Sequence, residues 1–371
     1  MPVSVIFGGQ FGSEGKGKTA HYFASNLNAK AVIRVGGPNS GHTVIDSNGQ
    51  PLILKQLPTA SIIRGVYSVI TSGNYLNVEI LLNEIRLTGV DEEHLYIDPY
   101  AVIITKEDLK KEITMGLKES IGSTGSGIGA AVSRRVNRDK NLSFAKDEPQ
   151  LKKYIRNTNS FLRNLLEYKE RIIIEGTQGF GLSLLHSGLY PYTTSRDTSA
   201  AAFVSEAGLS PLDIDDVVMV LRSFPIRVGG NSGPLPSETD WSKITDISGS
   251  IEPLIELTSV TKKVRRVAVF NPVVVKKAIE VNNPTKIVLN HVDYFNIDCK
   301  DGIITTKVLD EIKAIEKSIN RRIDFLGFDR TKLYSKADVL NRSFIDHTKR
   351  VNSYDSRDKS KSRTRGSRKE V

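Results

Sequence analysis

Residues 8–19 read Gly-Gly-Gln-Phe-Gly-Ser-Glu-Gly-Lys-Gly-Lys-Thr and decide the fold class. The apolar run Val3–Phe7 before them predicts a buried strand, and Lys18–Leu27 predicts a helix after them. Small residues between a strand and a helix let backbone N–H groups close on a phosphate, and the helix adds its positive end. Lys16 and Lys18 add positive charge. The stretch therefore predicts a phosphate-binding loop, although a Gly-rich turn can also be purely structural.

Residues Gly12–Thr19 also match the Walker A pattern literally, with Lys18 and Thr19 in its last two places. In that register Lys18 contacts the phosphates, and the chain is an ordinary phosphate-loop ATPase.

Apolar runs and helical patterns alternate along the rest of the chain. Further strands are expected at Ala31–Val35, Val66–Thr71, Leu95–Ile104, Arg171–Glu175, Val217–Leu221, Val267–Phe270 and Lys286–Leu289. Further helices are expected at Lys106–Glu119, Gln150–Tyr168, Val274–Val281 and Val308–Asn320. This alternation predicts an α/β fold with a mainly parallel central sheet flanked by helices, similar to phosphate-loop NTPases.

The chain is expected to form one large α/β domain at residues 1–341 with inserted loops. Residues 120–139 are rich in Gly, Ser and Arg and are not expected to join the core. Residues 342–371 lack periodicity and are rich in Ser, Lys, Arg and Asp, which predicts a basic, disordered tail.

The composition limits the compartment and the ligands. A single cysteine, Cys299, excludes an intramolecular disulfide, and no apolar run is long enough to span a bilayer. Both features favour a cytoplasmic protein without a membrane partner. The net charge of +10 suits anionic ligands, which are either nucleotides or nucleic acid. No segment interleaves aromatic and basic residues as a nucleic-acid surface does, so a nucleic-acid partner is not expected.

A second loop, Gly36–Thr43, reads Gly-Gly-Pro-Asn-Ser-Gly-His-Thr. His42 stands between small residues, where a packed core histidine is unusual. Histidine can supply a proton or stabilise negative charge near neutral pH. Taken alone, the loop favours a turn histidine that bonds to the backbone.

Together, the two loops closely resemble those of the adenylosuccinate synthetase family, which usually reads Gln-Trp-Gly-Asp-Glu-Gly-Lys-Gly-Lys and then Asn-Ala-Gly-His-Thr. The resemblance continues in four further motifs and covers roughly residues 3–330. These motifs are Ile121–Gly129, Glu175–Gly179, Tyr190–Thr194 and Val260–Arg266. In the family register Lys16, not Lys18, contacts phosphate, and we prefer that register to the literal Walker match.

The resemblance implies a carbon–nitrogen ligase that uses Mg²⁺. Family members move a γ-phosphoryl group onto the purine 6-oxygen, after which the amine of L-aspartate displaces phosphate. By similarity, the catalytic residues are Ser13, Lys16 and His42, and Ser13 and Gly41 ligate Mg²⁺. His42 would neutralise charge near the 6-oxygen.

The resemblance also assigns binding residues. The nucleoside triphosphate would contact Gly12, Ser13, Glu14, Gly15, Lys16, Gly17, Gly41, His42, Thr43, Asn290, Asp293 and Gly327. The purine monophosphate would contact Ser13, Asn39, Ser123, Thr124, Arg138, Gln178, Thr194 and Lys263. Aspartate would contact Val260, Thr261, Lys263, Val264, Arg265 and Arg266. Arg138 matches an arginine that reaches the nucleotide of a neighbouring subunit, which implies a homodimer.

One departure from the family pattern bears on the substrate. Ser13 replaces the aspartate that takes the proton from purine N1, and serine is a poor general base. The shorter side chain leaves room beside the purine 2-position, where a 2-amino group could bond to the hydroxyl. This pattern resembles the phage-encoded branch, the 2-aminoadenylosuccinate synthetases, which use dGMP with ATP or dATP. An impaired synthetase is the alternative interpretation of Ser13.

Three further departures affect nucleotide recognition. His291 replaces a lysine in the guanine-reading motif Asn290–Asp293, and Phe325-Leu-Gly-Phe328 replaces Ser-Thr-Gly-Pro, so an aromatic ring there could stack on any purine. Both changes favour ATP over GTP. Lys263 stands where many members have arginine near the ribose.

Three functions follow as hypotheses. The first is a dGMP–aspartate ligase that uses ATP, the second is ordinary adenylosuccinate synthesis from IMP with GTP, and the third is a basic nucleic-acid-binding ATPase.

Overall fold

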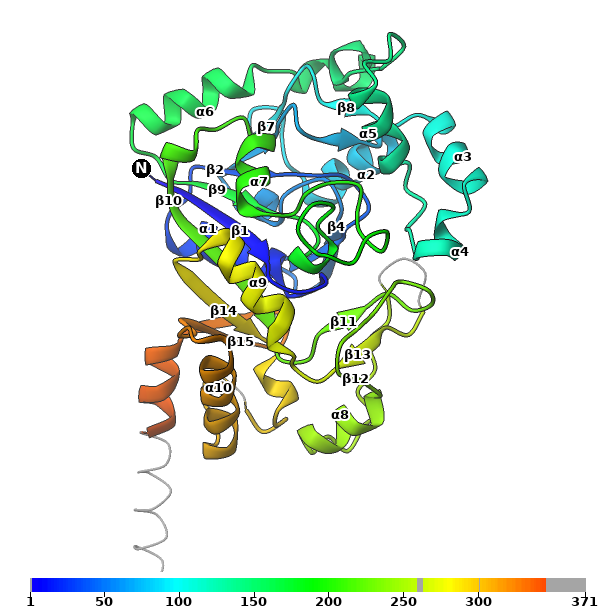
Figure 1. The fold of residues 1–371 in the computed structure, drawn as a ribbon. Helices are drawn as coiled ribbons and strands as arrows, with labels where there is room; N and C mark the ends of the chain where they lie inside the picture. The colour runs from blue at the N-terminus through cyan, green and yellow to red at the C-terminus, as the bar shows by residue number, and fades with distance from the viewer. Residues whose placement is uncertain (1, 259–262, 300, 345–371) are drawn as a thin grey trace, which may run out of the picture.

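The structure is a computed structural model that describes residues 2–258, 263–299 and 301–344. A nine-stranded sheet runs through its centre (Figure 1). The strand order is β16-β15-β14-β10-β1-β9-β2-β5-β7, and neighbouring strands are parallel except for β15 and β16. The strands are β1 Val3–Gly8, β2 Ala31–Arg34, β5 Tyr67–Ile70, β7 Leu95–Ile97, β9 Ile172–Glu175, β10 Ile214–Arg222, β14 Lys286–Asn290, β15 Phe325–Phe328 and β16 Lys332–Ser335.

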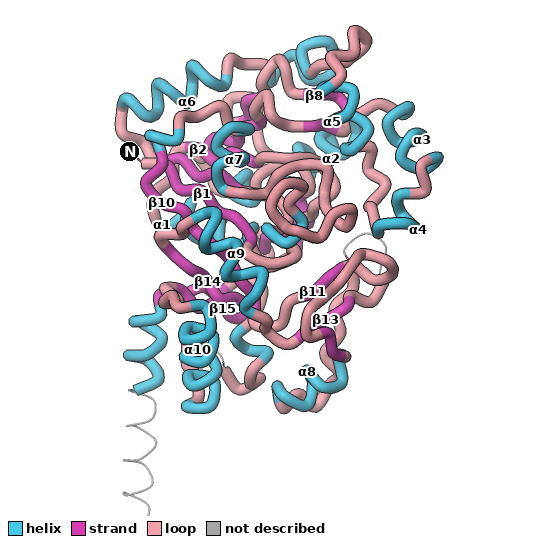
Figure 2. Tube along the Cα trace, viewed as in Figure 1, coloured by secondary structure: helices cyan, strands magenta, loops and turns pink. Residues whose placement is uncertain are grey.

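Helices cover both faces of this sheet (Figure 2). The α-helices are α1 Lys16–Asn26, α2 Val78–Thr88, α3 Lys106–Thr114, α4 Leu117–Ile121, α5 Ile128–Val136, α6 Thr158–Glu167, α7 Ala200–Glu206, α8 Trp241–Ser248, α9 Pro272–Asn282 and α10 Thr306–Ile319. The 3₁₀ helices are η1 Thr59–Ile62, η2 Ala145–Asp147, η3 Pro149–Tyr154, η4 Phe180–Leu182, η5 Pro211–Asp213 and η6 Val292–Tyr294. Helix α1 packs on one face, whereas α6, α7, α9 and α10 pack on the other.

The central strands are continuous apolar runs because both of their faces are buried. Every residue of β1 and β9 is buried. Ile6 and Ile173 face α1, and Val5 and Ile174 face the opposite layer. The buried strands therefore fix the position at which each following loop begins.

Three small sheets lie outside the central one. An antiparallel sheet in the order β11-β13-β12 stands beside α8 in Figure 1, β3 pairs with β4, and β6 pairs with β8. Their bounds are β3 His42–Ile45, β4 Pro51–Leu54, β6 Tyr75–Leu76, β8 Val102–Ile103, β11 Ile226–Arg227, β12 Glu238–Thr239 and β13 Arg266–Ala268.

The predicted α/β fold with a mainly parallel sheet is confirmed, but two of the predicted strand segments lie wholly or partly outside the central sheet. Leu95–Ile104 divides into β7 and β8, which belong to different sheets, because Asp98–Ala101 forms a turn between them. Val267–Phe270 does not extend the central sheet, since its first two residues lie in β13.

Two predicted helices are also divided. Lys106–Glu119 breaks into α3 and α4 at Gly116, which has a left-handed φ of 60°. Gln150–Tyr168 begins as η3, and α6 starts only after Asn157, whose side chain accepts a bond from the Ser160 N–H. A capping side chain competes locally with a continuous helix.

Residues 120–139 do contribute to the core, contrary to the prediction. They contain α5, whose Ile128, Ala130 and Ala131 are buried. The small alanine side chains allow α5 to approach its neighbours closely. The composition of residues 120–139 did not indicate this packing.

The predicted domain boundary at residue 341 falls inside a helix that runs from residue 336 to 344. Ser343 Oγ accepts a 2.9 Å bond from the Ile304 N–H, so this helix is joined to the domain. Residues 345–371 of the predicted tail lie outside the described residues.

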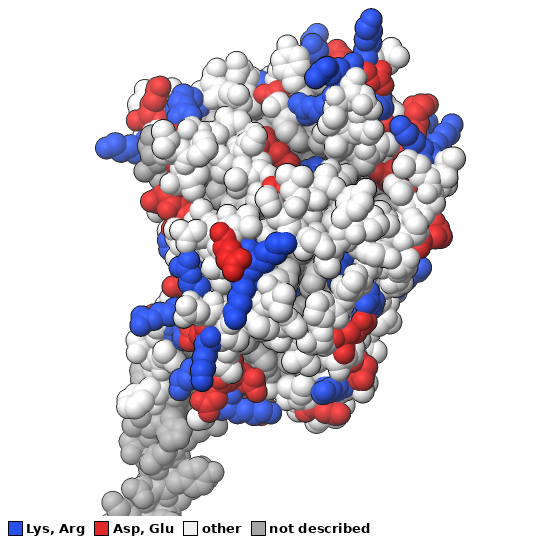
Figure 3. Space-filling view, in the orientation of Figure 1, with Lys and Arg blue, Asp and Glu red and all other residues white. Residues whose placement is uncertain are grey.

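The surface carries charges of both signs. On the face drawn in Figure 3, Lys and Arg side chains are interspersed with Asp and Glu around a largely uncharged centre. Among the residues that the structure describes, no helix combines the length and the apolar character needed to cross a bilayer.

Candidate active site

The predicted loops meet at the carboxyl edge of the central sheet. Strands β1, β2 and β9 end at Gly8, Arg34 and Glu175, while β10 and β14 end at Arg222 and Asn290. Carboxyl ends of parallel strands are the usual place for ligand sites in α/β folds. Segments far apart in sequence are therefore brought to one edge.

The first loop is shaped from inside by Glu14. This fully buried carboxylate accepts bonds from the Gln10 N–H at 3.2 Å and the Gly12 N–H at 2.8 Å. It also pairs with Lys16 Nζ at 2.6 Å. Glu14 thus holds Lys16 within the loop, and the Glu14 carboxylate is occupied by bonds inside the loop.

The start of α1 is open to an anion. Gly15 caps the helix with a φ of 90° and no side-chain bond, and no acidic residue lies in the first turn. Unpaired N–H groups at such a helix end attract phosphate. Gly17, in the first turn, packs so closely on His42 that an added Cβ would lie 2.8 Å from the His42 Cβ.

The Lys18 side chain turns away from the loop and the Thr19 hydroxyl bonds to the helix start, which disagrees with the literal Walker register. Lys18 Nζ donates to the carbonyl oxygens of Phe328 at 3.3 Å and Asp329 at 3.0 Å. Thr19 Oγ1 donates to the Gly15 carbonyl at 3.1 Å. These contacts favour the register in which Lys16 serves the phosphate.

The pH dependence of stability tests the burial of Lys18. Burial lowers the pKa of Lys18 to about 8, although Asp293 and Asp329 oppose the shift. The folded state then releases a proton that the unfolded chain still binds up to its ordinary pKa of about 10.4. We therefore expect the free energy of unfolding to rise, relative to a Lys18→Met variant, between pH 8 and pH 10. Urea unfolding at several pH values measures this difference, and parallel curves would contradict it.

The second loop delivers His42 to a buried carboxylate. His42 Nδ1 lies 2.5 Å from Glu175 Oε1, and Arg34 Nη1 donates to the same oxygen at 2.8 Å. The other oxygen, Oε2, accepts from the N–H and hydroxyl of Thr59, each at 2.8 Å. Arg34 donates further to the carbonyls of Ser40 and Lys55. Glu175 therefore fixes the histidine ring, and His42 Nε2 is buried with no partner among the described residues.

The electrostatics leave the histidine neutral. Burial and the charge of Arg34 lower the pKa of His42 to about 4, despite the bond to Glu175. Burial alone would raise the pKa of Glu175, but His42, Arg34 and the Thr59 N–H outweigh it and lower the pKa. Neutral His42 donates its Nδ1–H to the Glu175 carboxylate and presents an unprotonated Nε2.

Two arginines hold Ser13, whose φ of 58° is left-handed. Arg222 Nη1 donates to the Ser13 carbonyl at 3.2 Å, and Arg265 Nη1 donates to its hydroxyl at 2.8 Å. The carboxylate of Glu256 pairs with Arg222 through both oxygens and accepts from Tyr294 Oη at 3.0 Å. The charges of Arg222, His291 and Arg265 lower the pKa of Glu256 to about 2, against the effect of burial.

The predicted nucleobase residues gather around Asn290. Its Nδ2 donates to the Glu14 carbonyl at 2.8 Å, which ties β14 to the first loop. Burial raises the pKa of Asp293, and its Oδ1 is buried without a partner among the described residues. Asp293 therefore offers an acceptor for a donor group of a base.

The predicted stacking by the Phe325–Phe328 segment is wrong. The segment is β15, in which Phe328 is buried and Phe325 packs on Tyr22 and Phe23 with ring centroids 6.1 Å and 5.3 Å apart. The sheet pleat points these rings into the core rather than toward a ligand.

Gly327 is required for close packing against Asn290. A Cβ at position 327 would lie 1.8 Å from Asn290 Oδ1 and 2.9 Å from Lys18 Nζ. We expect Gly327→Ala to lower the free energy of unfolding by about 1–3 kcal/mol. The matched control is Gly49→Ala, where nothing lies within 4 Å of the added Cβ and only backbone strain at a φ of 78° applies. A Gly327→Ala variant as stable as the wild type would contradict the steric argument.

The remaining predicted site residues are exposed or only partly buried. Gly41, Thr43, Thr124 and Arg138 are exposed, and Ser123, Thr194, Asn39 and Gln178 are partly buried. Gln178 Oε1 and Asn39 Oδ1 are both buried without partners in the part of the chain that is described. Arg138 makes no side-chain hydrogen bond or ion pair within those residues, so its predicted partner contact stays a prediction.

The aspartate-binding segment is described only in part. Val260 and Thr261 lie outside the described residues. Lys263 and Val264 are exposed. Arg266 differs from the prediction, because Glu238 binds its guanidinium and Gly233 accepts a further 2.7 Å bond from it. Arg265 is therefore the arginine of this segment that faces the first loop.

Sequence reasoning missed several charged residues of the site. Arg34, Arg222 and Glu256 are polar residues at strand ends or in a plain loop, and they carry no motif signal. An arginine that closes a largely apolar strand, as Arg34 and Arg222 do, is the signal that could have found two of these residues.

The predicted Mg²⁺ ligands fit the ion unequally. Mg²⁺ prefers oxygen ligands and keeps waters and substrate phosphates, so a Gly41 carbonyl is suitable. The Ser13 hydroxyl already accepts from Arg265, whose positive charge opposes a nearby cation. No group of three or more His, Cys, Asp or Glu side chains suited to a metal occurs within residues 2–258, 263–299 and 301–344.

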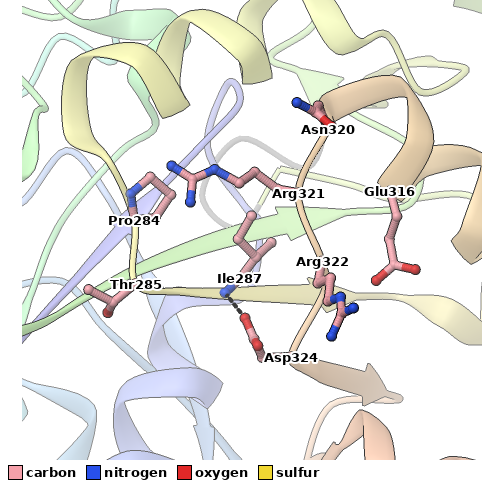
Figure 4. A pocket seen from close by; sticks show the side chains of 8 residues that line it. All are labelled: Pro284, Thr285, Ile287, Glu316, Asn320, Arg321, Arg322 and Asp324. Atoms are coloured by element: carbon pink, nitrogen blue, oxygen red, sulfur yellow. Dashed lines mark hydrogen bonds between the residues drawn. The ribbon is translucent and has the colours of Figure 1, made fainter.

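A separate pocket of about 530 Å³ lies at the opposite edge of the sheet (Figure 4). Asp324, just before β15, accepts a 2.8 Å bond from the Ile287 N–H there, and Arg321 donates to Asn283. Glu316 pairs there with Lys336 at 2.6 Å. None of the predicted site residues lines this pocket.

Comparisons with known proteins place the chain among known families. The sequence model described as adenylosuccinate synthetase matches residues 5–146 and 140–308. The adenylosuccinate synthetase of Methanococcus maripaludis strain C5 is 34% identical over 87% of this chain and 94% of its own length. That of Archaeoglobus fulgidus is 34% identical over 86% of this chain and 93% of its own length.

Two solved structures share the fold. The succinoaminodeoxyadenylate synthetase of cyanophage S-2L, bound to dGMP and dATP, superposes with a TM-score of 0.76 at 26% identity, over 92% of this chain and 99% of that one. The fully ligated adenylosuccinate synthetase of Plasmodium falciparum gives a TM-score of 0.77 at 22% identity, over 90% and 99%.

Proposed function

Because the chain belongs to the adenylosuccinate synthetase family and is thus a carbon–nitrogen ligase, we propose that it joins L-aspartate to C6 of dGMP. The reaction consumes ATP or dATP and yields N6-succino-2-amino-2'-deoxyadenylate. The observation that carries this proposal is Ser13, an exposed hydroxyl at the position where the family has a carboxylate. This assignment would place the chain with the phage-type members of the family.

The physical argument concerns space and hydrogen bonding beside the purine. Guanine and hypoxanthine share the 6-oxygen and N1–H, and they differ only at C2, where guanine carries an amino group. Replacing a carboxylate by a hydroxyl removes atoms and leaves an oxygen that can accept from that amino group. A site that hydrogen-bonds a substrate group rejects the analogue that lacks it, because its own polar atom is left unpaired.

The chemistry follows from the residues at the carboxyl edge. An oxygen on C6 is a poor leaving group until it is phosphorylated. The Lys16 ammonium and the open N–H groups of α1 would stabilise charge on the transferred phosphoryl group. Mg²⁺, when bound, would neutralise phosphate charge, and Gly41 would be its protein ligand. His42, oriented by Glu175, would lie near the 6-oxygen and exchange a proton there.

The choice of ATP or dATP rests on two observations. His291 replaces the lysine of the guanine-reading motif, and the cyanophage structure contains dATP. Asp293 can accept from the 6-amino group of adenine as well as from guanine, so the base preference needs direct measurement.

Ordinary adenylosuccinate synthesis from IMP and GTP is the second candidate. It is favoured by the names of the archaeal relatives, which are 32–35% identical to this chain. A nucleic-acid-binding ATPase is disfavoured, because Lys18 does not face the first loop and the face in Figure 3 is not uniformly basic.

We further propose a homodimer. Arg138 is exposed at the end of α5 in a left-handed conformation with a φ of 56°. A guanidinium in this position is accessible to the phosphate of a nucleotide in a neighbouring subunit.

Phosphate release with a matrix of substrates tests the proposed function. Each of dGMP, dIMP and IMP is combined with ATP, dATP or GTP, in the presence and absence of aspartate. We expect aspartate-dependent release with dGMP and ATP or dATP. Strong release with IMP and none with dGMP would reject the substrate assignment, and release independent of aspartate would reject ligase activity.

A further inference from the structure

The hydroxyl of Ser13 is not free to rotate, because it belongs to a bonded cluster. Arg265 Nη1 lies 2.8 Å from Ser13 Oγ. A guanidinium contains only N–H donors, so Ser13 Oγ must be the acceptor in this bond. One lone pair of the oxygen is therefore committed to Arg265, and the hydroxyl proton must point elsewhere.

Arg265 is itself placed by several contacts. Its Nε donates to the Leu257 carbonyl at 3.1 Å, its backbone N–H donates to the Glu256 carbonyl at 2.9 Å, and its carbonyl accepts from Trp241 Nε1 at 2.7 Å. These bonds tie the backbone and the Nε of Arg265 to neighbouring segments. The guanidinium is thus held in position before any substrate arrives.

Both arginines of the cluster share the counter-charge of Glu256. Glu256 pairs with the fully buried Arg222, and its charge also acts on Arg265. Arg222 donates a hydrogen bond to the Ser13 carbonyl and Arg265 donates one to the Ser13 hydroxyl, so Ser13 is held at two points. Glu256 therefore orients Arg222 through an ion pair, acts on Arg265 through its charge, and is a positioning residue.

We propose that Arg265 is a specificity-determining residue whose bond to Ser13 Oγ presents the remaining lone pair of that oxygen to the 2-amino group of a guanine nucleotide. The proposal rests on the proposed function and adds to it: extra space at position 13 does not suffice, because selectivity requires an oriented acceptor. A hydroxyl without Arg265 could turn its proton toward the amino group and lose the bond.

A double-mutant cycle tests this coupling with dGMP and dIMP, which differ only in the 2-amino group. The ratio of kcat/KM for dGMP to that for dIMP is measured in the wild type, Ser13→Ala, Arg265→Lys and the double variant. We expect each single change to lower the ratio about tenfold, the effect of one hydrogen bond, with no further fall in the double variant. Any loss of aspartate affinity in Arg265→Lys is common to both nucleotides and cancels in the ratio.

Two further variants make the cycle decisive. Glu256→Gln keeps its size and should also lower the ratio, but only when Ser13 is present. Arg266→Lys is the matched control, because Arg266 binds Glu238 and not Ser13, and its ratio should equal that of the wild type. Thermal melting checks that each variant is folded.

The outcomes separate the two claims. An unchanged ratio in Arg265→Lys, or single effects that multiply in the double variant, would overturn the role of Arg265 while leaving dGMP ligation intact. A wild type that consumes dIMP but not dGMP would overturn the proposed function itself.

Discussion

Replacing Glu175 with glutamine is expected to lower kcat on the order of 10³-fold, within the range for loss of a proton-transfer group. All four contacts to the Glu175 carboxylate come from donors on Arg34, His42 and Thr59. A glutamine amide has one oxygen, which accepts, and one NH₂ group, which only donates. Two of the four donors that bind the carboxylate would therefore face this NH₂ group. The His42 ring then loses its orientation and the preferred position of its proton.

The same change should lower the free energy of unfolding by about 3–5 kcal/mol, because it leaves the buried Arg34 charge without its partner. Glu84→Gln is a matched control, since Glu84 is buried and accepts only from the N–H groups of Lys55, Gln56 and Leu57 among the described residues. Steady-state kinetics and urea unfolding are compared for both variants. If the folded Glu84→Gln enzyme loses kcat as severely as Glu175→Gln, the effect reflects general destabilisation and not His42.

Replacing Ser13 with aspartate is expected to lower the dGMP/dIMP ratio of kcat/KM by about 10- to 200-fold, the usual effect of a misfit of a few atoms. The carboxylate would pair with Arg265 and occupy the space beside C2. A carboxylate could also act as a base toward N1 of either nucleotide, and this gain cancels in the ratio. Position 13 has a left-handed φ of 58°, which Asp and Asn adopt more readily than most residues, so the variant should fold.

Ser13→Asn separates size from charge in this experiment. Asparagine has nearly the same volume as aspartate but cannot form an ion pair with Arg265. If only the size of the side chain matters, the two variants should have similar dGMP/dIMP ratios. If the ion pair with Arg265 contributes, the ratio should be lower for the aspartate variant. A dGMP/dIMP ratio that stays at the wild-type value in both would mean that position 13 does not select the base.

The sequence predicted the fold class because its signals are local. Apolar runs such as Val3–Phe7 and Arg171–Glu175 require burial on both faces, and Gly-rich loops follow them directly. Helix and strand breaks were harder to predict, since they depend on single residues. Gly116 and Asn157 interrupt patterns that are otherwise continuously helical.

The site was predicted in outline, but its internal bonding was not. Glycines and lysines in the first loop point to phosphate through their residue type and spacing. The pairs Arg34–Glu175 and Arg222–Glu256 join residues that are 141 and 34 positions apart, so no local pattern indicates them. The misjudged Phe328 shows the converse limit: an aromatic residue in a motif position can be a strand residue whose side chain faces the core.

The most direct test of the account is to follow the nitrogen of aspartate. The enzyme is incubated with ¹⁵N-aspartate, ATP and an equal mixture of dGMP and IMP, and the products are separated and identified by mass spectrometry. The account predicts that ¹⁵N appears mainly in N6-succino-2-amino-2'-deoxyadenylate, with the 2-amino group of the guanine retained. Label found in adenylosuccinate alone would contradict it.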